Sequence, residues 1–415
     1  MTKYLEDKRV SLILVIVCFM TYVIIALTRN AYGAAIVGII SEGYFTKSQA
    51  GVISTSFNIT YCLSQIVGSY FVDKVSPFKL ILLGTIVTIF ANIAMSITPT
   101  YWVIFVARGV CGVAQFGTWP ALLRILSEYV NEHHRHTWRY ILPLGVTAGS
   151  VVSYIGAALI TNWRGLFTLS YILMAIATVV FMITARYANK KAVVKEIEPK
   201  TPQKPEEKKP EPEKISVFKL LSTSGTLFFM IPAFARSLIN NGITNWMPTM
   251  LMECYGVSPS ISSAMTTIST IANFIAVFWV VLLYPRVFKL QSTAMGMLFL
   301  LTFPFMFGFG FIGTIPMIIA VIFIAVSNTI SNSINQFNTV ELPGAFVKYN
   351  KAGMVAGLIN SVATASGIIS GWLWGFMAEN YSWNMIIMLW AALTLLSAIC
   401  CFAATPLWKR FVIKE

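Results

Sequence analysis

Charged side chains are scarce in this sequence. Asp, Glu, Lys and Arg make up only 11% of the 415 residues, and just 16 residues are acidic, whereas soluble domains carry about 25% charged residues. The three histidines, His133, His134 and His136, occupy one short stretch. We find no nucleophile with a neighbouring base, no cluster of metal ligands and no phosphate-cradling loop. We therefore expect neither an enzyme nor a resident metal ion or cofactor.

The cysteines and the N-terminal segment exclude two further features. The apolar run behind Arg9 is too long for a signal-peptide core and lacks a small-residue cleavage site, so we expect a retained first helix. The six cysteines lie in or beside apolar segments without metal-ligand spacing, and we interpret them as packing residues that form no disulfide. They are Cys18, Cys62, Cys111, Cys254, Cys400 and Cys401.

Apolar residues are abundant, at 57% of the chain with a mean hydropathy of +0.73. This composition predicts a polytopic membrane protein without a soluble domain of useful size. A membrane-spanning helix requires about 20 mostly apolar residues. The apolar runs predict an all-α membrane protein of twelve such helices, at about residues 10–40, 48–72, 78–98, 101–127, 138–160, 164–186, 218–252, 259–284, 290–312, 314–338, 352–377 and 383–407.

The basic residues predict the orientation of these helices. In a soluble protein the net charge of +14 would suggest nucleic-acid binding, but in a membrane protein the position of each charge matters more, and we expect no nucleic-acid partner. Of the 30 lysines and arginines, three fall within helices (Arg29, Arg108, Arg236), two on one side (Lys47, Arg164), and all the others on the opposite side with both termini. We therefore expect cytoplasmic termini, in a bacterial inner membrane.

A Lys-, Glu- and Pro-rich segment divides the helices into six and six. The stretch from Lys200 to Lys214 has the composition of a solvated linker. We predict an N-terminal six-helix bundle at residues 1–186, a cytoplasmic linker at 187–217 and a C-terminal bundle at 218–415. This division favours two pseudo-symmetric bundles, a substrate site near the midplane between them, and alternating access by rocking of one bundle on the other.

One arginine lies inside the first apolar segment. Arg29 interrupts a run from about Ser11 to Ile40, and a guanidinium in hydrocarbon costs at least about 2.5 kcal/mol unless it faces protein or water. Tyr22 and Tyr32 fall on the same helical face, which favours a lined cavity with Arg29 as an anion ligand. In the alternative interpretation, Arg29 lies near the outer end of its helix and extends to the membrane interface.

A short turn follows the second helix. The stretch from Gly68 through Asp73 and Lys74 resembles the G-x4-D-[RK] signature of the major facilitator superfamily. The resemblance implies a conformational latch, in which Asp73 pairs with a cation or a helix N-terminus in one state and releases it in the other. The matching turn of the second half, residues 284–289, has no acid, so we predict only the first latch.

A motif in the predicted fourth helix relates the sequence to particular branches of this superfamily. Arg108, Gly112, Gln115, Gly117 and Pro120 follow the pattern R-x3-G-x2-[E/Q]-x-G-x2-P. That pattern is similar to two organic-anion branches of the superfamily, the organophosphate:phosphate antiporters and the anion:cation symporters. Supporting matches occur in the first, seventh and eleventh helices, at Arg29, from Asn240 to Thr249, and from Ala352 to Asn360.

The sequence departs from both branches where they normally carry charge. The resemblance places Asn240 where the antiporters usually have a second arginine, Gln65 where they have a lysine, and Ala148 near a usual histidine. The symporters often have acids at two positions where this chain has Thr28 and Gln115. The usual phosphate site and the usual proton carriers are therefore both incomplete.

Two more arginines need an interpretation. Arg236 lies one turn before Asn240 and thus on a similar face of the seventh helix, where it supplies the missing second cation in one interpretation. In the other, it packs against carbonyls or neighbouring polar groups. We interpret Arg108, which lies near the outer end of the fourth helix on these boundaries, as structural.

Polar residues recur at helical spacing in three predicted helices. Amides can bond hydroxyls or a carboxylate without contributing charge. Isolated Ser and Thr residues usually form hydrogen bonds between helices. An amide without a hydrogen-bond partner in hydrocarbon is costly, so the row of asparagines favours a polar cavity beside them. These stripes comprise Asn58, Tyr61 and Gln65, then Asn328, Ser331, Asn332, Asn335 and Asn338, then Asn360 and Thr364.

These patterns predict a carrier of a small organic anion. Every acidic residue falls outside the membrane centre and the histidines fall in a loop, so we see no titratable group at depth and favour exchange over proton coupling. Arg29 with Arg236 would form a two-arginine site suited to a dianionic phosphate, which we favour; Arg29 with the asparagines would suit a monoanionic sugar acid. The predicted substrate ligands are Arg29, Tyr32, Tyr61, Gln65, Gln115, Arg236, Asn240, Asn332, Asn335 and Asn360.

Two alternatives to anion exchange stay open. One is an ion-coupled symporter of a carboxylate or sugar acid. The other is a transporter-like sensor that signals through the linker, although the sequence contains no recognisable signalling module. We expect a monomer whose partners are the lipid bilayer, a sugar phosphate, glycerol phosphate or sugar acid as substrate, and inorganic phosphate or another anion as the exchange partner.

Overall fold

The chain folds into two compact helical units. The computed structural model describes residues 2–72, 74–160, 162–195, 217–287, 290–346, 349 and 351–413. The first unit comprises Met1–Lys204 with Ser258–Thr267, and the second comprises Pro205–Val257 with Ile268–Glu415. Most of the predicted linker lies outside the described residues.

In the first unit, the apolar runs form helices because a backbone in hydrocarbon must satisfy its own hydrogen bonds. The Asp7 carboxylate begins the first helix by accepting the backbone N–H groups of Arg9 and Val10, and Pro77 occupies the first turn of the third. The helices are α1 (Lys8–Ser41), α2 (Lys47–Val72), α3 (Pro77–Ile97), α4 (Tyr101–Gln115), α5 (Thr118–Glu128), α6 (Glu132–Ile141), α7 (Leu144–Leu159) and α8 (Trp163–Lys191). Strands β1 (Thr2–Tyr4) and β2 (Val193–Lys195) pair antiparallel.

In the second unit, glycines in the left-handed region flank the 30-residue helix α10 (Thr226–Tyr255). Gly225 (φ 74°) precedes it and Gly256 (φ 63°) follows it, a conformation that favours glycine. The helices are α9 (Val217–Thr223), α10 (Thr226–Tyr255), α11 (Pro259–Val287), α12 (Gln291–Phe309), α13 (Met317–Gln336), the π-helix η1 (Phe337–Glu341), α14 (Leu342–Gly344), α15 (Ala352–Asn380) and α16 (Trp383–Ile413). The first residues of α11 belong to the first unit.

Each of the twelve predicted segments coincides with one helix or with consecutive helices. The predicted fourth helix is broken into α4 and α5 at Phe116–Gly117, and the predicted fifth corresponds to α6 and α7, which are bent by 56°. The histidine stretch was expected in a loop. It is helical instead, because Asn131 caps α6 by accepting the backbone N–H of His133.

Seven helices of the described residues are long and apolar enough to cross a membrane, or eight if α6 and α7 form one bent span. The seven are α1, α3, α8, α12, α13 with its continuation, α15 and α16. Two of the remaining helices, α4 and α7, have only 15 and 16 residues. Others, such as α10, carry the polar side chains that the sequence places at depth.

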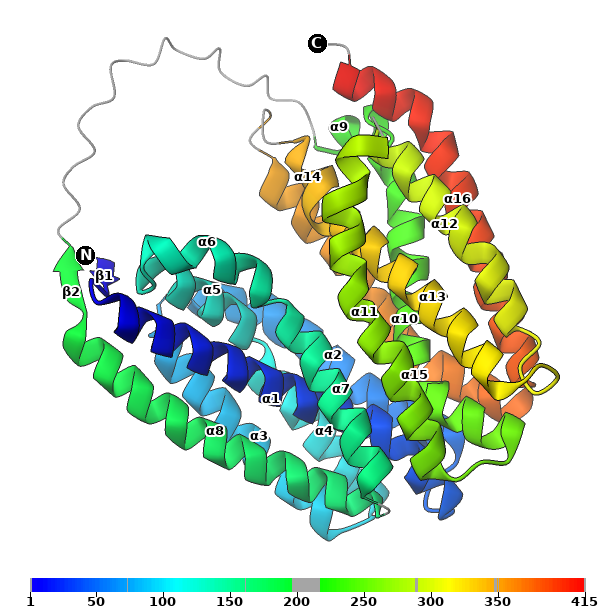
Figure 1. The fold of residues 1–415 in the computed structure, drawn as a ribbon, viewed down its shortest axis with the longest axis horizontal. Coiled ribbons are helices and arrows are strands. Elements are labelled where there is room, and N and C mark those ends of the chain that lie inside the picture. The colour runs from blue at the N-terminus through cyan, green and yellow to red at the C-terminus, as the bar shows by residue number, and fades with distance from the viewer. Residues whose placement is uncertain are drawn as a thin grey trace. The chain divides into compact units, whose positions relative to one another are not determined.

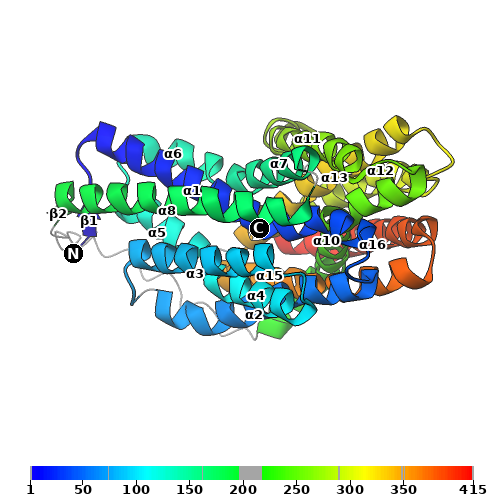
Figure 2. The same ribbon diagram turned by 90° about the horizontal axis from the view of Figure 1, so that it is seen from below.

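The two units repeat one pattern of helix pairing. In the first, α1 packs against α7 and α8, and α3 packs against α4 and α8 (Figures 1 and 2). In the second, α10 packs against α15 and α16, and α12 packs against α13 and α16. The first, third, fourth, fifth and sixth predicted helices of each half therefore occupy equivalent places within their unit, in agreement with a pseudo-repeat.

Glycines set the closest approaches within the first unit. A Cβ on Gly112 of α4 would meet the carbonyl oxygen of Phe57 and the side chain of Thr60 on α2. A Cβ on Gly149 of α7 would meet the Val23 carbonyl and the Ala26 side chain on α1. Lipid-embedded helices associate through such close packing, because burial from water provides little driving force there. These contacts position α4 against α2 and α7 against α1.

Candidate functional site

The guanidinium of Arg29 points into the first unit. Its Nε donates to Oε1 of Gln115 on α4 at 3.2 Å, and its Cζ lies 5.1 Å from the ring centroid of Tyr61 and 5.8 Å from that of Phe57 on α2. Arg29 stands twelve residues before Ser41, the last residue of α1, which is about 18 Å of helix. This geometry favours the interior site over extension to the membrane interface.

Arg108 lies beside Arg29 and is only 5% exposed. Its Nη2 donates to the carbonyl oxygen of Arg29 at 2.7 Å. Its Cζ lies 4.5 Å from the Phe57 ring centroid and 5.2 Å from that of Tyr32, so Phe57 contacts both guanidinium groups. Arg108 thus holds the backbone of α1 at Arg29, which supports the interpretation of Arg108 as structural.

Neither arginine is neutralised within the described residues. Arg29 and Arg108 have no carboxylate partner there, and the Nε and Nη1 atoms of Arg108 are buried without a hydrogen-bond acceptor. Aromatic rings stabilise a guanidinium through their negative faces but do not cancel its charge. The interior of this unit is therefore positively charged, which suits an anionic ligand.

Gln115 connects Arg29 to Thr28. The Gln115 side chain is almost completely buried, at 1% exposure, and its Nε2 donates to the Thr28 hydroxyl oxygen at 3.2 Å. The two positions at which the symporter branch is expected to carry acids are therefore in direct contact. Here they hold a hydroxyl and an amide, both neutral.

Some predicted ligands have other contacts. Tyr32 is fully buried, and its hydroxyl donates to the Ala50 carbonyl on α2 at 3.0 Å, so it contributes its ring to the site rather than its hydroxyl. Tyr61 and Gln65 are half-buried on α2, where the Tyr61 ring stacks on Phe57 at 5.7 Å. Sequence reasoning gave Phe57 no role, because a lone phenylalanine in an apolar helix carries no signal.

A further polar contact near Arg29 was also missed. The Asn30 side-chain amide donates to the Ala26 carbonyl at 2.9 Å and to the Ser150 hydroxyl on α7 at 2.8 Å. Asn30 follows Arg29 directly, and an asparagine beside an arginine in an apolar run is a signal that could have been used. The contact joins α1 to α7 where Gly149 lets them approach.

In the second unit, Arg236 is buried between α10 and α13. Its Nε donates to the Ser331 carbonyl at 2.9 Å and its Nη2 to Oδ1 of Asn332 at 3.0 Å, with only 8% of the residue exposed. The Asn332 amide lies 3.5 Å from Oδ1 of Asn328. This arrangement corresponds to the second sequence interpretation, in which Arg236 packs against carbonyls and polar groups, and it brings Arg236 and Asn332 together.

The other predicted ligands of this unit differ in exposure. Asn240 and Asn335 are half-buried, and Asn360 is exposed. The polar stripe on α13 was predicted to include Asn338. Asn338 lies in η1, where the π-helical turn changes the register of the face, and it is 3% exposed.

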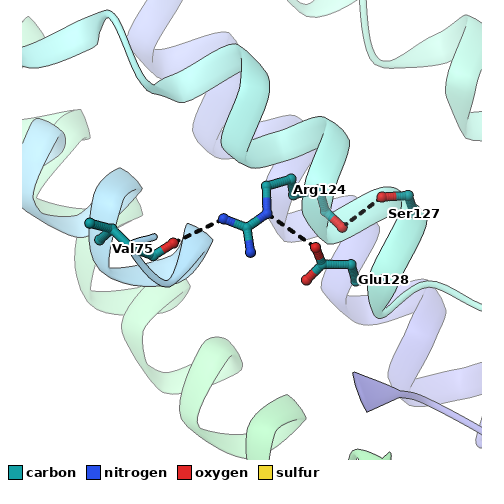
Figure 3. Close-up of polar contacts among 4 residues, drawn as sticks. All are labelled: Val75, Arg124, Ser127 and Glu128. Atoms are coloured by element: carbon teal, nitrogen blue, oxygen red, sulfur yellow. Dashed lines mark hydrogen bonds and ion pairs between the residues drawn. The ribbon is translucent and has the colours of Figure 1, made fainter. Parts of the chain in front are cut away.

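The predicted latch is described only in part. Asp73 lies outside the described residues, and Lys74 is exposed. The turn that contains them is joined to α5, because Nη1 of Arg124 donates to the Val75 carbonyl at 3.0 Å and its Nε contacts Glu128 at 3.1 Å (Figure 3). Sequence reasoning did not select Arg124 or Glu128, although their i, i+4 spacing is a recognisable signal.

Residues 18–371 match the model of the Major Facilitator Superfamily, and the chain belongs to this family. It is therefore an integral, multi-pass membrane protein, as the sequence predicted. The predicted all-α fold is confirmed.

Solved structures support the fold alone. The match to the nucleoside transporter NupG covers 96% of this chain and 99% of that chain, with a TM-score of 0.67 and 14% sequence identity. The match to a bacterial homolog of the human lysosomal transporter Spinster covers 99% of each chain, with a TM-score of 0.69 and 15% sequence identity.

Three curated proteins are similar to parts of this chain. A probable hexose phosphate transport protein of Chlamydia trachomatis is 28% identical over 150 residues, which are 35% of this chain and 33% of that protein. The glycerol-3-phosphate transporter of Bacillus subtilis is 23% identical over 269 residues, 61% of this chain and 60% of its own. The membrane sensor protein UhpC of Escherichia coli is 25% identical over 146 residues, 34% and 33%. The chain thus spans about a third of the first relatives it matches.

Proposed function

We propose that the protein exchanges small organic anions by alternating access, with a sugar phosphate, glycerol phosphate or sugar acid as substrate. The observation that carries the proposal is the environment of Arg29. This arginine is directed into the first unit, and its hydrogen-bond acceptor in the described residues is the neutral Gln115. Arg29 is half-buried, and a cation inside a membrane-spanning unit without a counter-ion is costly, so an anionic ligand that reaches it gains a charge-assisted hydrogen bond.

The relatives support this substrate class. Two of them are named for the transport of hexose phosphate and of glycerol 3-phosphate. Both compounds combine an anionic group with several hydroxyls. The anionic group of each compound matches Arg29 of the first unit.

Exchange rather than net uptake follows from the charge balance. In the described residues, Arg29, Arg108 and Arg236 all lack a carboxylate partner. Reorienting an empty carrier would carry uncompensated charge through a low-dielectric region, whereas a bound anion would offset part of that charge. A carrier of this kind moves readily only when it is loaded, and it therefore exchanges one anion for another.

A ligand screen tests the substrate class. Purified protein is heated with inorganic phosphate, glycerol 3-phosphate, glucose 6-phosphate or gluconate, and the melting temperature is compared with that in chloride. Any ligand that binds only the folded state raises this temperature. We expect a shift from at least one organic anion, and uncharged glucose and glycerol serve as controls. Shifts from the uncharged compounds alone would contradict the proposal.

The two alternatives predict different results in vesicles. A symporter would accumulate anion in response to a proton or sodium gradient with nothing inside. A sensor would bind anion but would not move it. One relative is itself named as a membrane sensor, so transport by this chain has to be measured separately from binding.

A further inference from the structure

A chain of three hydrogen bonds fixes the side chain of Gln115. The Thr28 hydroxyl donates to the Ile25 carbonyl at 2.8 Å, so the Thr28 oxygen can only accept the bond from Gln115. The Gln115 amide must therefore direct its Nε2 at Thr28 and its Oε1 at Arg29. Because amide orientation is assigned from such networks, Thr28 determines which end of Gln115 faces the arginine.

This contact leaves one edge of Arg29 available. Gln115 accepts from Nε, and in the described part of the chain the two terminal nitrogens, Nη1 and Nη2, have no hydrogen-bond partner. Two parallel N–H groups are the geometry that binds a carboxylate or phosphate through two oxygens. Gln115 thus orients the guanidinium and occupies only the nitrogen that such a ligand does not need.

We infer that Gln115 is a positioning residue, which orients Arg29 through a neutral acceptor and thereby keeps the cation available to substrate at every physiological pH. The inference rests on the proposed function, because it assumes that Arg29 binds the transported anion. Gln115 acts through Arg29 and Thr28 and does not itself contact the substrate. A carboxylate at this position would be a permanent competitor for Arg29.

The titratable groups that face Arg29 or Arg108 come from three helices. They are Tyr22 and Tyr32 on α1, Tyr61 on α2 and Cys111 on α4. No carboxyl or imidazole group is among these neighbours in the described part of the chain.

The first test replaces the amide by a carboxyl. Binding of glycerol 3-phosphate and of gluconate to purified Gln115→Glu is measured at pH 5.5 and pH 8, each as a ratio of Kd to that of the wild type, which removes the ligand's own titration. At pH 8 we expect binding at least about tenfold weaker, because the new carboxylate pairs with Arg29. Pairing with Arg29 keeps the pKa of the new carboxyl below its ordinary value of about 4.3, so the ratio should be about the same at pH 5.5.

A matched control variant tests whether weaker binding requires the carboxylate to stand beside Arg29 or follows from any added negative charge. Gln291 also accepts one hydrogen bond, from the Trp408 indole at 3.0 Å, and lies in the second unit. Gln291→Glu should bind both anions as the wild type does at either pH. A Gln115→Glu protein that binds like the wild type at pH 8 would overturn the inference.

A second test applies even if Gln115→Glu does not fold. Gln115→Met keeps the shape without the acceptor, and Thr28→Val removes the group that orients the amide. Because both break the same chain, the double variant should bind no more weakly than Gln115→Met alone. Additive losses would show that the residues act separately and would overturn the inference. A wild-type protein that binds no anion would instead overturn the proposed function.

Discussion

The indole N–H of Trp163 donates to the carboxylate of Glu42 at 3.1 Å, and this bond joins the start of α8 to the end of α1. Trp163 is the first residue of α8, and Glu42 follows the last residue of α1. In the second unit, Trp383, the first residue of α16, makes the same bond at 2.7 Å to Glu253 in the last turn of α10. Equivalent helices of the two units are thus joined by the same pair of residue types.

We expect Trp163→Phe to destabilise the protein without changing anion affinity. A hydrogen bond to a charged group contributes about 1.5–3 kcal/mol, and the phenyl ring preserves the packing but not the donor. The melting temperature of the purified protein should fall by about 2–4 °C. Trp102→Phe is the control, because Trp102 is 67% exposed and should show no shift. Equal melting of both variants would show that the bond adds nothing.

Arg29→Gln should abolish anion binding and leave a folded membrane protein. Loss of a charge-assisted, two-point contact costs a few kcal/mol, which is a drop in affinity of about 100-fold or more. Arg29→Lys should fail as well, because an ammonium cannot present two parallel N–H groups. Isothermal titration measures both. Arg164→Gln, which removes a cation stacked on Tyr44 at 5.5 Å, should bind normally; undiminished affinity of Arg29→Gln would remove Arg29 from the site.

Gly112→Ala should be strongly destabilising. The added methyl group would meet the backbone of α2 at Phe57 and displace α4, which carries Arg108 and Gln115. Overpacking of this kind costs about 1–3 kcal/mol. Gly353→Ala, where nothing lies within 4 Å, should be neutral or slightly stabilising. Thermal unfolding of the two variants gives the comparison, and a Gly112→Ala protein as stable as Gly353→Ala would contradict this packing.

Arg236→Gln distinguishes phosphates from sugar acids. If Arg236 contributes a second cation, the variant should lose most glucose 6-phosphate binding and retain gluconate binding. If the bonds to Ser331 and Asn332 occupy it fully, both affinities should change little, and the variant should instead be less stable. Titration of both ligands with both proteins separates the cases. Equal, large losses for both ligands would contradict each of them.

The helices were predictable from the sequence because a bilayer forces every apolar run of sufficient length to be helical. Arg29 was predictable as an interior cation for the same reason, since hydrocarbon tolerates few charges. The interruptions in these helices could not be predicted in the same way. The bend between α6 and α7 and the π-helical turn at Asn338 depend on how neighbouring turns pack. Hydropathy alone does not report that packing.

The sequence also could not predict which residues the predicted site residues contact. Gln115 was selected as a substrate ligand, yet it is bonded to Arg29 and Thr28, 86 and 87 positions away along the chain. Helical periodicity assigns a residue to a face but does not say which face of which helix it meets. Gly112, one turn before Gln115, brings α4 against α2, whose Phe57 and Tyr61 rings also contact Arg29.

Counterflow in proteoliposomes tests the central claim most directly. Vesicles loaded with unlabelled glycerol 3-phosphate, glucose 6-phosphate or gluconate are diluted into the labelled anion, with no gradient of pH or sodium. Anion exchange predicts that label enters rapidly when anion is inside and scarcely enters empty vesicles. Accumulation in empty vesicles that is driven by an imposed proton or sodium gradient would contradict exchange and identify an ion-coupled symporter.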